Sequence, residues 1–129
     1  MGPSRCIPSS VWPGWGHASE NPALVDALVA ANITFIGPPA RPMRLLGDKI
    51  GSTIIAQSAK VPTIAWNGDG LEVDVADLVK GIPDEMYAKA NVVTAEQCVE
   101  CALRIGPPVM IKASEGGGGK GIRRVDVAD

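Results

Sequence analysis

The chain has 129 residues, of which 46% are hydrophobic and 20% are charged, with a formal net charge of −2. This length suffices for one domain or parts of two, and the composition excludes a disordered tail. No apolar run approaches the roughly 20 residues of a transmembrane helix, and the acidic balance argues against a surface built for nucleic acid or anionic lipid.

The first predicted elements are a loop, a helix and a short strand. Residues 1–17 are rich in proline and glycine and show no helical period, so they are predicted to be a loop. Ser19 to Pro22 is a helix-start signal, because Ser19 or Asn21 can cap the helix and proline fits its first turn. Asn32 suits the helix end. A short buried strand is then predicted over residues 33–36.

A pair of helices follows. A short helix over residues 42–46 ends at Gly47, and Asp48 can cap a second helix over residues 49–59. Three further elements are predicted before residue 81: a strand over 62–65, a turn over 67–70 and a short helix over 75–80.

The last third is predicted to contain a helix and a hairpin. After a helical stretch over 83–89 and a strand over 91–93, Thr94 to Gln97 matches a capping box. The helix that it starts carries an apolar stripe of Val99, Ala102 and Leu103. The hairpin consists of a strand over 109–113, a loop over 114–121 and a returning strand over 122–125.

Three cysteines bear on compartment and on metal binding. Their small, odd number and the lack of a signal-peptide pattern favour a reducing compartment, so we expect a cytoplasmic protein; a plastid location would need a transit peptide upstream of Met1. Cys98 and Cys101 form a lone C-x-x-C, but a zinc site needs a second ligand pair and His17 is the only histidine. The pair is interpreted as two helix residues, and no metal site is predicted.

The strongest chemical signal is a lysine followed by a glycine cluster. Lys112 lies in an apolar strand, where an ammonium group is costly unless an anion meets it. The following glycines let a backbone approach a ligand and turn its N–H groups toward it, as polyphosphate binding requires. Lys120 adds charge at the loop exit. The pattern differs from a Walker A loop, because Gly121 and a strand follow the lysine. A flexible hairpin tip is the alternative interpretation.

Four segments together resemble one family. PGWGHASENP at 13–22, FIGPP at 35–39, GDK at 47–49 and PVMIKASEGGGGKGIRRV at 108–125 occur in this order in biotin carboxylase domains of acetyl-CoA carboxylases. The GWGHASEN form resembles the eukaryotic multidomain enzymes. The resemblance covers nearly the whole chain.

The resemblance implies functional residues. Lys49 and Lys112 would contact ATP, and a glycine-rich flap would close over the phosphates. Its members are Ser114, Gly116, Gly117, Gly118, Gly119, Lys120 and Gly121. Trp15 would lie near the reaction centre. His17, Glu20 and Asn21 would support their loop and the following helix. No catalytic residue or metal ligand is assigned within the chain.

The resemblance also implies an α/β fold in three parts. Residues 1–37 would be the end of a Rossmann-like N-terminal domain that precedes the ATP-grasp fold. Residues 38–62 would be a helical connector. Residues 63–129 would begin the α+β ATP-grasp lid and end partway through it.

The implied function is that of an enzyme fragment. ATP would activate bicarbonate for carboxylation of biotin in fatty-acid synthesis, with Mg²⁺ or Mn²⁺ and a biotinylated carrier domain, in a homo-oligomeric parent enzyme. We expect the isolated chain to be inactive, because the metal ligands and the bicarbonate site would lie downstream. Two alternatives stay open: a non-catalytic ATP-binding module, and the equivalent segment of another biotin-dependent carboxylase.

Overall fold

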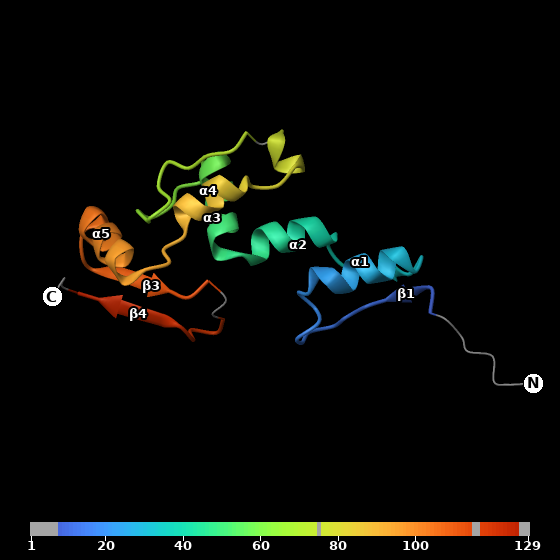
Figure 1. The fold of residues 1–129 in the computed structure, drawn as a ribbon. Coiled ribbons are helices and arrows are strands. Elements are labelled where there is room, and N and C mark those ends of the chain that lie inside the picture. Colours follow the sequence, from blue (N-terminus) through green and yellow to red (C-terminus); the bar gives the residue numbers. More distant parts are fainter. Residues whose placement is uncertain (1–7, 75, 115–116, 127–129) are drawn as a thin grey trace, which may run out of the picture. The chain divides into compact units, whose positions relative to one another are not determined.

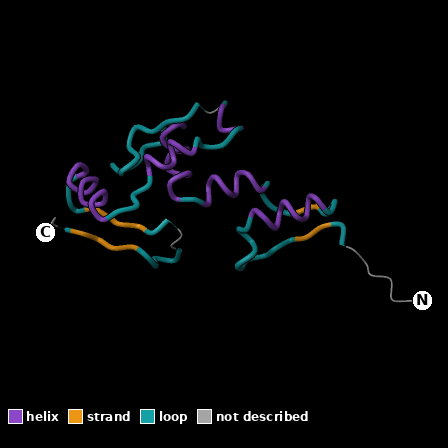
Figure 2. Tube along the Cα trace, in the orientation of Figure 1, coloured by secondary structure: helices purple, strands orange, loops and turns teal. Residues whose placement is uncertain are grey.

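The computed structural model describes residues 8–74, 76–114 and 117–126. The chain divides into two compact units, Met1–Gly47 and Asp48–Asp129. Each unit contains its own helices and its own pair of strands, as Figure 1 and Figure 2 show. The mixture of helices and strands agrees with the predicted α/β class.

The first unit contains a parallel strand pair. Strand β1 (Ser10–Val11) pairs with β2 (Thr34–Phe35), and helix α1 lies between them in the sequence and beside them in space (Figure 1). The prediction that residues 1–17 are all loop is therefore wrong at β1, while residues 1–7 lie outside the described part. A two-residue strand is too short for alternation to reveal, and its partner is more than 20 residues away.

Helix α1 (Pro22–Ala30) begins and ends as predicted. The Asn21 side chain accepts a hydrogen bond from the backbone N–H of Ala23 at 3.0 Å, and Pro22 occupies the first turn. Asn32, just beyond the helix, has a φ of 55°. Helix α2 (Ala40–Gly47) packs on α1, where an Arg44–Asp26 ion pair joins the two helices.

Strand β2 is more exposed than predicted. Residues 33–36 alternate between half-buried and exposed, and Ile36 is 53% exposed. A strand is fully buried only where layers cover both faces of its sheet. Here the described sheet has two strands, with α1 packed against β2.

The second unit has its core between α3 (Lys49–Ser58) and α4 (Asp84–Ala90). Ile54 is fully buried, and it packs with Ile50 and Ala90. Partly buried apolar side chains surround this cluster: Trp66, Leu71, Val73, Ile82, Met86 and Tyr87. Both helices confirm predicted ones. The predicted short helix over 75–80, whose first residue lies outside the described part, corresponds to the 3₁₀ helix η1 (Asp77–Val79).

A buried glutamine ties a loop to α3. Gln57 is 7% exposed and donates to the carbonyls of Gly68 (3.2 Å) and Leu71 (3.0 Å). Its carbonyl oxygen accepts the indole N–H of Trp66 at 2.6 Å. One side chain therefore satisfies three polar groups of the 66–71 segment, which contains the predicted turn over 67–70.

Replacing this amide is expected to destabilise the fold. Gln57→Leu keeps most of the side-chain volume but leaves the Trp66 N–H and two carbonyls without their partner, which costs about 2–3 kcal/mol. Chemical denaturation followed by circular dichroism measures the loss. Gln97→Leu makes the same change at an exposed helix cap and is expected to cost about 1 kcal/mol. Equal losses from the two variants would contradict the role of Gln57.

The predicted strands over 62–65 and 91–93 are wrong, because both segments are irregular. At and beside residues 91–93, side chains and not a neighbouring strand bond to the backbone. Next to the second segment, Asn67 donates to the carbonyl of Ala90, and the Gln97 side chain accepts from the N–H groups of Val93 and Thr94. Strand propensity alone does not reveal such partners.

Helix α5 (Ala95–Ile105) starts with the predicted capping box between Thr94 and Gln97. A backbone hydrogen bond and the Thr94 side chain hold the pKa of the Glu96 carboxyl below its ordinary value of 4.5. Its contribution to stability is therefore present above pH 4.5 and is lost as the pH falls through the lowered pKa.

The apolar stripe predicted on α5, Val99, Ala102 and Leu103, is half-buried only at Ala102. Val99 and Leu103 are 52% and 60% exposed. The half-buried positions, also spaced for one helical face, are Cys98, Cys101, Ala102 and Ile105. The two cysteines are free, which agrees with their interpretation as helix residues.

The predicted hairpin is confirmed. Strand β3 (Val109–Lys112) pairs antiparallel with β4 (Ile122–Val125), and the register places Val109 opposite Val125 and Lys112 opposite Ile122. Figure 1 shows the two strands side by side, joined by the glycine loop.

Candidate functional site

The glycine loop is closed at its base by the hairpin. The N–H of Ala113 donates to the carbonyl of Gly121 at 2.8 Å, which extends the β3–β4 ladder. Within the loop, the N–H of Lys120 donates to the carbonyl of Gly117 at 3.1 Å and forms a turn. Residues 115 and 116, including the predicted site residue Gly116, lie outside the described residues.

The turn requires glycine for its backbone. Gly118, Gly119 and Gly121 have φ angles of 60°, 80° and 71°, in the left-handed region that L side chains rarely adopt. A Cβ atom at Gly118 or Gly119 would meet nothing within 4 Å. The conformation, and not crowding by the protein, therefore accounts for these two glycines, and the space beside them is open to a ligand.

A lysine from α3 reaches the start of this loop. The Lys49 ammonium group donates to the backbone carbonyl of Ser114 at 3.1 Å, across 65 residues of sequence. Lys49 is the first residue of α3, and Ser114 follows β3. The structure thus brings together two of the segments that the resemblance assigns to nucleotide binding.

The residue before Lys49 is held from two sides. One carboxylate oxygen of Asp48 accepts the N–H of Gly51 at 2.7 Å, as the predicted cap requires. The other accepts the hydroxyl of Tyr87 from α4 at 2.9 Å. Sequence reasoning missed Tyr87, and no local pattern would have found it, because it lies 39 residues from Asp48.

The two other site lysines belong to the hairpin and are exposed. Lys112 ends β3, and Lys120 lies in the turn. Lys112 is therefore not a buried lysine, as its apolar strand had suggested, because β3 belongs to a hairpin whose faces are only partly covered. Lys49 nevertheless reaches the glycine loop, and Lys112 and Lys120 belong to its hairpin, so lysines accompany a glycine backbone, a combination suited to a polyanion.

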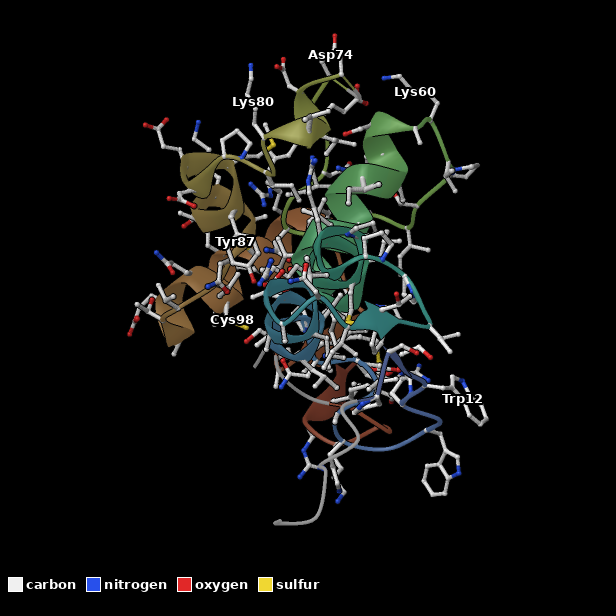
Figure 3. All side chains as sticks on the ribbon, turned by 90° about the vertical axis from the view of Figure 1, so that its right-hand side faces the viewer. Trp12, Lys60, Asp74, Lys80, Tyr87 and Cys98 are labelled. Carbon is white, nitrogen blue, oxygen red and sulfur yellow. The ribbon has the colours of Figure 1, made fainter. Side chains whose placement is uncertain are left out.

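The tryptophan-rich segment lies in the first unit. Trp15 is 96% exposed and Trp12 is 75% exposed, and Figure 3 shows the Trp12 side chain pointing away from the ribbon. The Ser19 hydroxyl donates to the carbonyl of Gly16 at 2.6 Å and accepts its N–H at 3.2 Å. His17, Glu20 and Asn21 are exposed.

Acidic or sulfur ligands for a metal do not gather in the part of the chain that the structure describes. Among those residues, no group of three or more His, Cys, Asp or Glu side chains is arranged to hold an ion. No group of metal ligands is therefore assigned to the described residues.

Each helix in residues 8–74, 76–114 and 117–126 is too short or too polar to cross a bilayer.

Comparison with known proteins matches both ends of the chain to families. Residues 5–43 match the family described as "Biotin carboxylase, N-terminal domain", and residues 74–129 match "Carbamoyl-phosphate synthase L chain, ATP binding domain". Acetyl-CoA carboxylase 2 of Oryza sativa subsp. japonica is 61% identical over 117 residues, which is 91% of this chain. The chain belongs to the biotin carboxylase family.

Other relatives agree with this assignment. Acetyl-CoA carboxylase of Dictyostelium discoideum is 58% identical over 118 residues (90% of this chain), and the Saccharomyces cerevisiae protein named mitochondrial acetyl-CoA carboxylase is 55% identical over 125 residues (93%). This biotin carboxylase chain spans only about 5% of the length of the first two relatives and 6% of the third.

Solved biotin carboxylases share the fold. The Campylobacter jejuni biotin carboxylase, a complex with β,γ-ATP, is 32% identical with a TM-score of 0.72 over 93% of this chain and 22% of that one. The biotin carboxylase domain of Hydrogenobacter thermophilus 2-oxoglutarate carboxylase is 32% identical with a TM-score of 0.68 over 92% of this chain and 21% of that one. That second structure is a dimer in complex with MgADP, ADP and bicarbonate.

Proposed function

We propose that this chain supplies part of the ATP site of the biotin carboxylase component of an acetyl-CoA carboxylase. In that enzyme ATP would drive the carboxylation of biotin by bicarbonate, as a step of fatty-acid synthesis. One observation carries the proposal: the Lys49 ammonium group meets the Ser114 carbonyl at the entrance of the glycine loop, 3.1 Å away. An ammonium group and a side-chain-free loop at one place suit the phosphates of a nucleotide.

Each site residue has a proposed role. Lys49 and Lys112 bind the phosphate oxygens as charged donors. Ser114 and the glycine run form a flap whose backbone N–H groups point toward the phosphates, and Lys120 adds charge at the flap's exit. The left-handed φ angles of Gly118 and Gly119 support this role, because they turn successive peptide groups within a short loop.

The relatives' ligands support the same substrates. The Campylobacter structure holds a β,γ-ATP ligand, and the Hydrogenobacter domain holds MgADP and bicarbonate. We propose ATP and bicarbonate for this chain's enzyme, together with a biotinylated carrier domain and Mg²⁺ or Mn²⁺ bound by residues outside this chain. We propose a homo-oligomer, since the Hydrogenobacter domain is a dimer. The cytoplasm remains the expected location, although the Saccharomyces relative is named mitochondrial.

The three-part division is also a proposal. Residues 1–37 would end the Rossmann-like N-terminal domain, 38–62 would form the helical connector, and 63–129 would begin the ATP-grasp lid. The matches at 5–43 and 74–129 support a different origin for the two ends. The unit boundary after Gly47 falls within the proposed connector.

A hybrid enzyme tests the proposed function. In it, this chain replaces the homologous segment of the Saccharomyces acetyl-CoA carboxylase, to which it is 55% identical. We expect bicarbonate-dependent ATP hydrolysis and biotin carboxylation comparable with those of the parent enzyme. A folded hybrid that binds ATP without turning it over would favour a non-catalytic module. A folded hybrid that fails to bind ATP would contradict the proposal.

A further inference from the structure

The hydrogen bond between Tyr87 and Asp48 involves neither of the groups proposed to bind ATP directly. Asp48 is adjacent to Lys49, and its carboxylate accepts from two directions: the Gly51 N–H at 2.7 Å and the Tyr87 hydroxyl at 2.9 Å. The first bond lies within the start of α3, and any good helix cap would supply it. The second bond comes from a different helix and therefore fixes the carboxylate relative to α4.

Tyr87 is well placed to act as a fixed donor. Its ring is half-buried and packs against the cluster of Ile50, Ile54 and Ala90, the core between α3 and α4. Packing of the ring limits the positions that the hydroxyl can take. A hydrogen bond from a hydroxyl to a charged carboxylate is also stronger than one between two neutral groups. The core of the unit is in this way connected to the first turn of α3.

The connection continues to the glycine loop. From Asp48 the backbone runs directly into Lys49, whose ammonium group reaches the Ser114 carbonyl at 3.1 Å. A shift of the α3 start would move the base of the Lys49 side chain away from the loop. A phosphate site binds its ligand well only when each charged donor is placed precisely, because misplacement weakens every contact with the phosphate.

We propose that Tyr87 is a positioning residue for the nucleotide site, acting through Asp48 on Lys49. Tyr87 does not touch the nucleotide. Its hydroxyl holds the Asp48 carboxylate, which fixes the first turn of α3 and with it the direction from which Lys49 approaches the phosphates. This inference rests on the proposed function, since it assumes that Lys49 binds ATP.

Tyr87→Phe in the hybrid enzyme tests the inference. Phenylalanine keeps the ring in the core and removes only the hydroxyl. We expect the KM for ATP to rise about tenfold, near the lower end of the effect of one lost hydrogen bond to a charged group, with kcat nearly unchanged. This split is expected because Lys49 contacts ATP in both the ground state and the transition state.

A matched control separates positioning from stability. The Ser58 hydroxyl lies at the other end of α3, where it donates to the Ile54 carbonyl at 2.8 Å and accepts the Val73 N–H at 2.9 Å. Ser58→Ala also deletes a partly buried hydroxyl from this unit. It is expected to lower the melting temperature while leaving the KM for ATP unchanged. If Tyr87→Phe behaved like Ser58→Ala, with a lower melting temperature and an unchanged KM, Tyr87 would be only structural.

A double-mutant cycle identifies the residue through which Tyr87 acts. In a Lys49→Met background, Tyr87→Phe is expected to have no further effect on the KM for ATP. Full additivity of the two changes would overturn the inference. The proposed function has a separate point of failure: Lys49→Met with an unchanged KM would contradict ATP binding at this site. If Lys49→Met raised the KM for ATP while Tyr87→Phe left it unchanged, only the positioning role of Tyr87 would be contradicted.

Discussion

Lys112→Met in the hybrid enzyme is expected to lower kcat/KM for ATP by about 100-fold, the loss typical of removing one donor from developing transition-state charge. Methionine keeps the length and apolar character of the lysine stem, so β3 and its pairing with β4 should persist. The loss then comes from the missing ammonium group. Steady-state hydrolysis of ATP, with and without bicarbonate, measures it.

The control makes the same substitution at a lysine remote from the loop. Lys80 lies beside η1 with its side chain 82% exposed, and it pairs with Asp77 at 2.8 Å. Figure 3 shows it projecting away from the ribbon. An exposed ion pair contributes little, so Lys80→Met is expected to leave kcat/KM unchanged. A Lys112→Met enzyme as active as the Lys80→Met enzyme would remove Lys112 from the site.

Gly119→Ala is expected to raise the KM for ATP about tenfold or more while destabilising the fold by only about 1–2 kcal/mol, the cost of a side chain at a left-handed φ. The added methyl group meets no protein atom within 4 Å, so the strain is in the backbone. To relieve it the loop must change its peptide directions. Its N–H groups would then no longer converge on the phosphates.

A second glycine provides a matched control for this strain. Gly70 has a φ of 79°, against 80° for Gly119, and a Cβ there would also meet nothing within 4 Å. Gly70→Ala should therefore cause a similar loss of stability with an unchanged KM for ATP. Asparagine tolerates the left-handed region better than alanine, so Gly119→Asn should recover part of the stability. Equal kinetic effects at Gly70 and Gly119 would show that the loop's glycines serve only the fold.

Local signals in the sequence predicted most of the helices. The caps at Asn21, Asp48 and Thr94 each involve a side chain and an N–H two or three residues away, so the relevant residues lie next to one another in the sequence. The hairpin was predictable for the same reason, because a short glycine loop joins its strands. Family resemblance, and not residue spacing, then singled out Lys49.

Long-range contacts account for what the sequence did not reveal. The parallel pairing of Ser10 with Thr34 and the contact of Tyr87 with Asp48 depend on how separate elements pack. Gln57 is a polar residue within a helix, and no pattern in the sequence around it predicts that it is buried. The prediction that Lys112 is buried was wrong because an apolar strand sequence fits a buried strand and a half-covered hairpin equally well.

Lys49 and the glycine hairpin are proposed to surround the phosphates of ATP. An ATP analogue with a desthiobiotin acyl group on its γ-phosphate tests this directly in the hybrid enzyme. A lysine amine near that phosphate attacks the acyl carbon, an amide bond forms, the acyl–phosphate bond breaks and ATP leaves. We predict labelling of Lys49, Lys112 and Lys120 that excess ATP suppresses. Labelling spread equally over Lys60, Lys80 and Lys89, or labelling that ATP does not suppress, would contradict the claim.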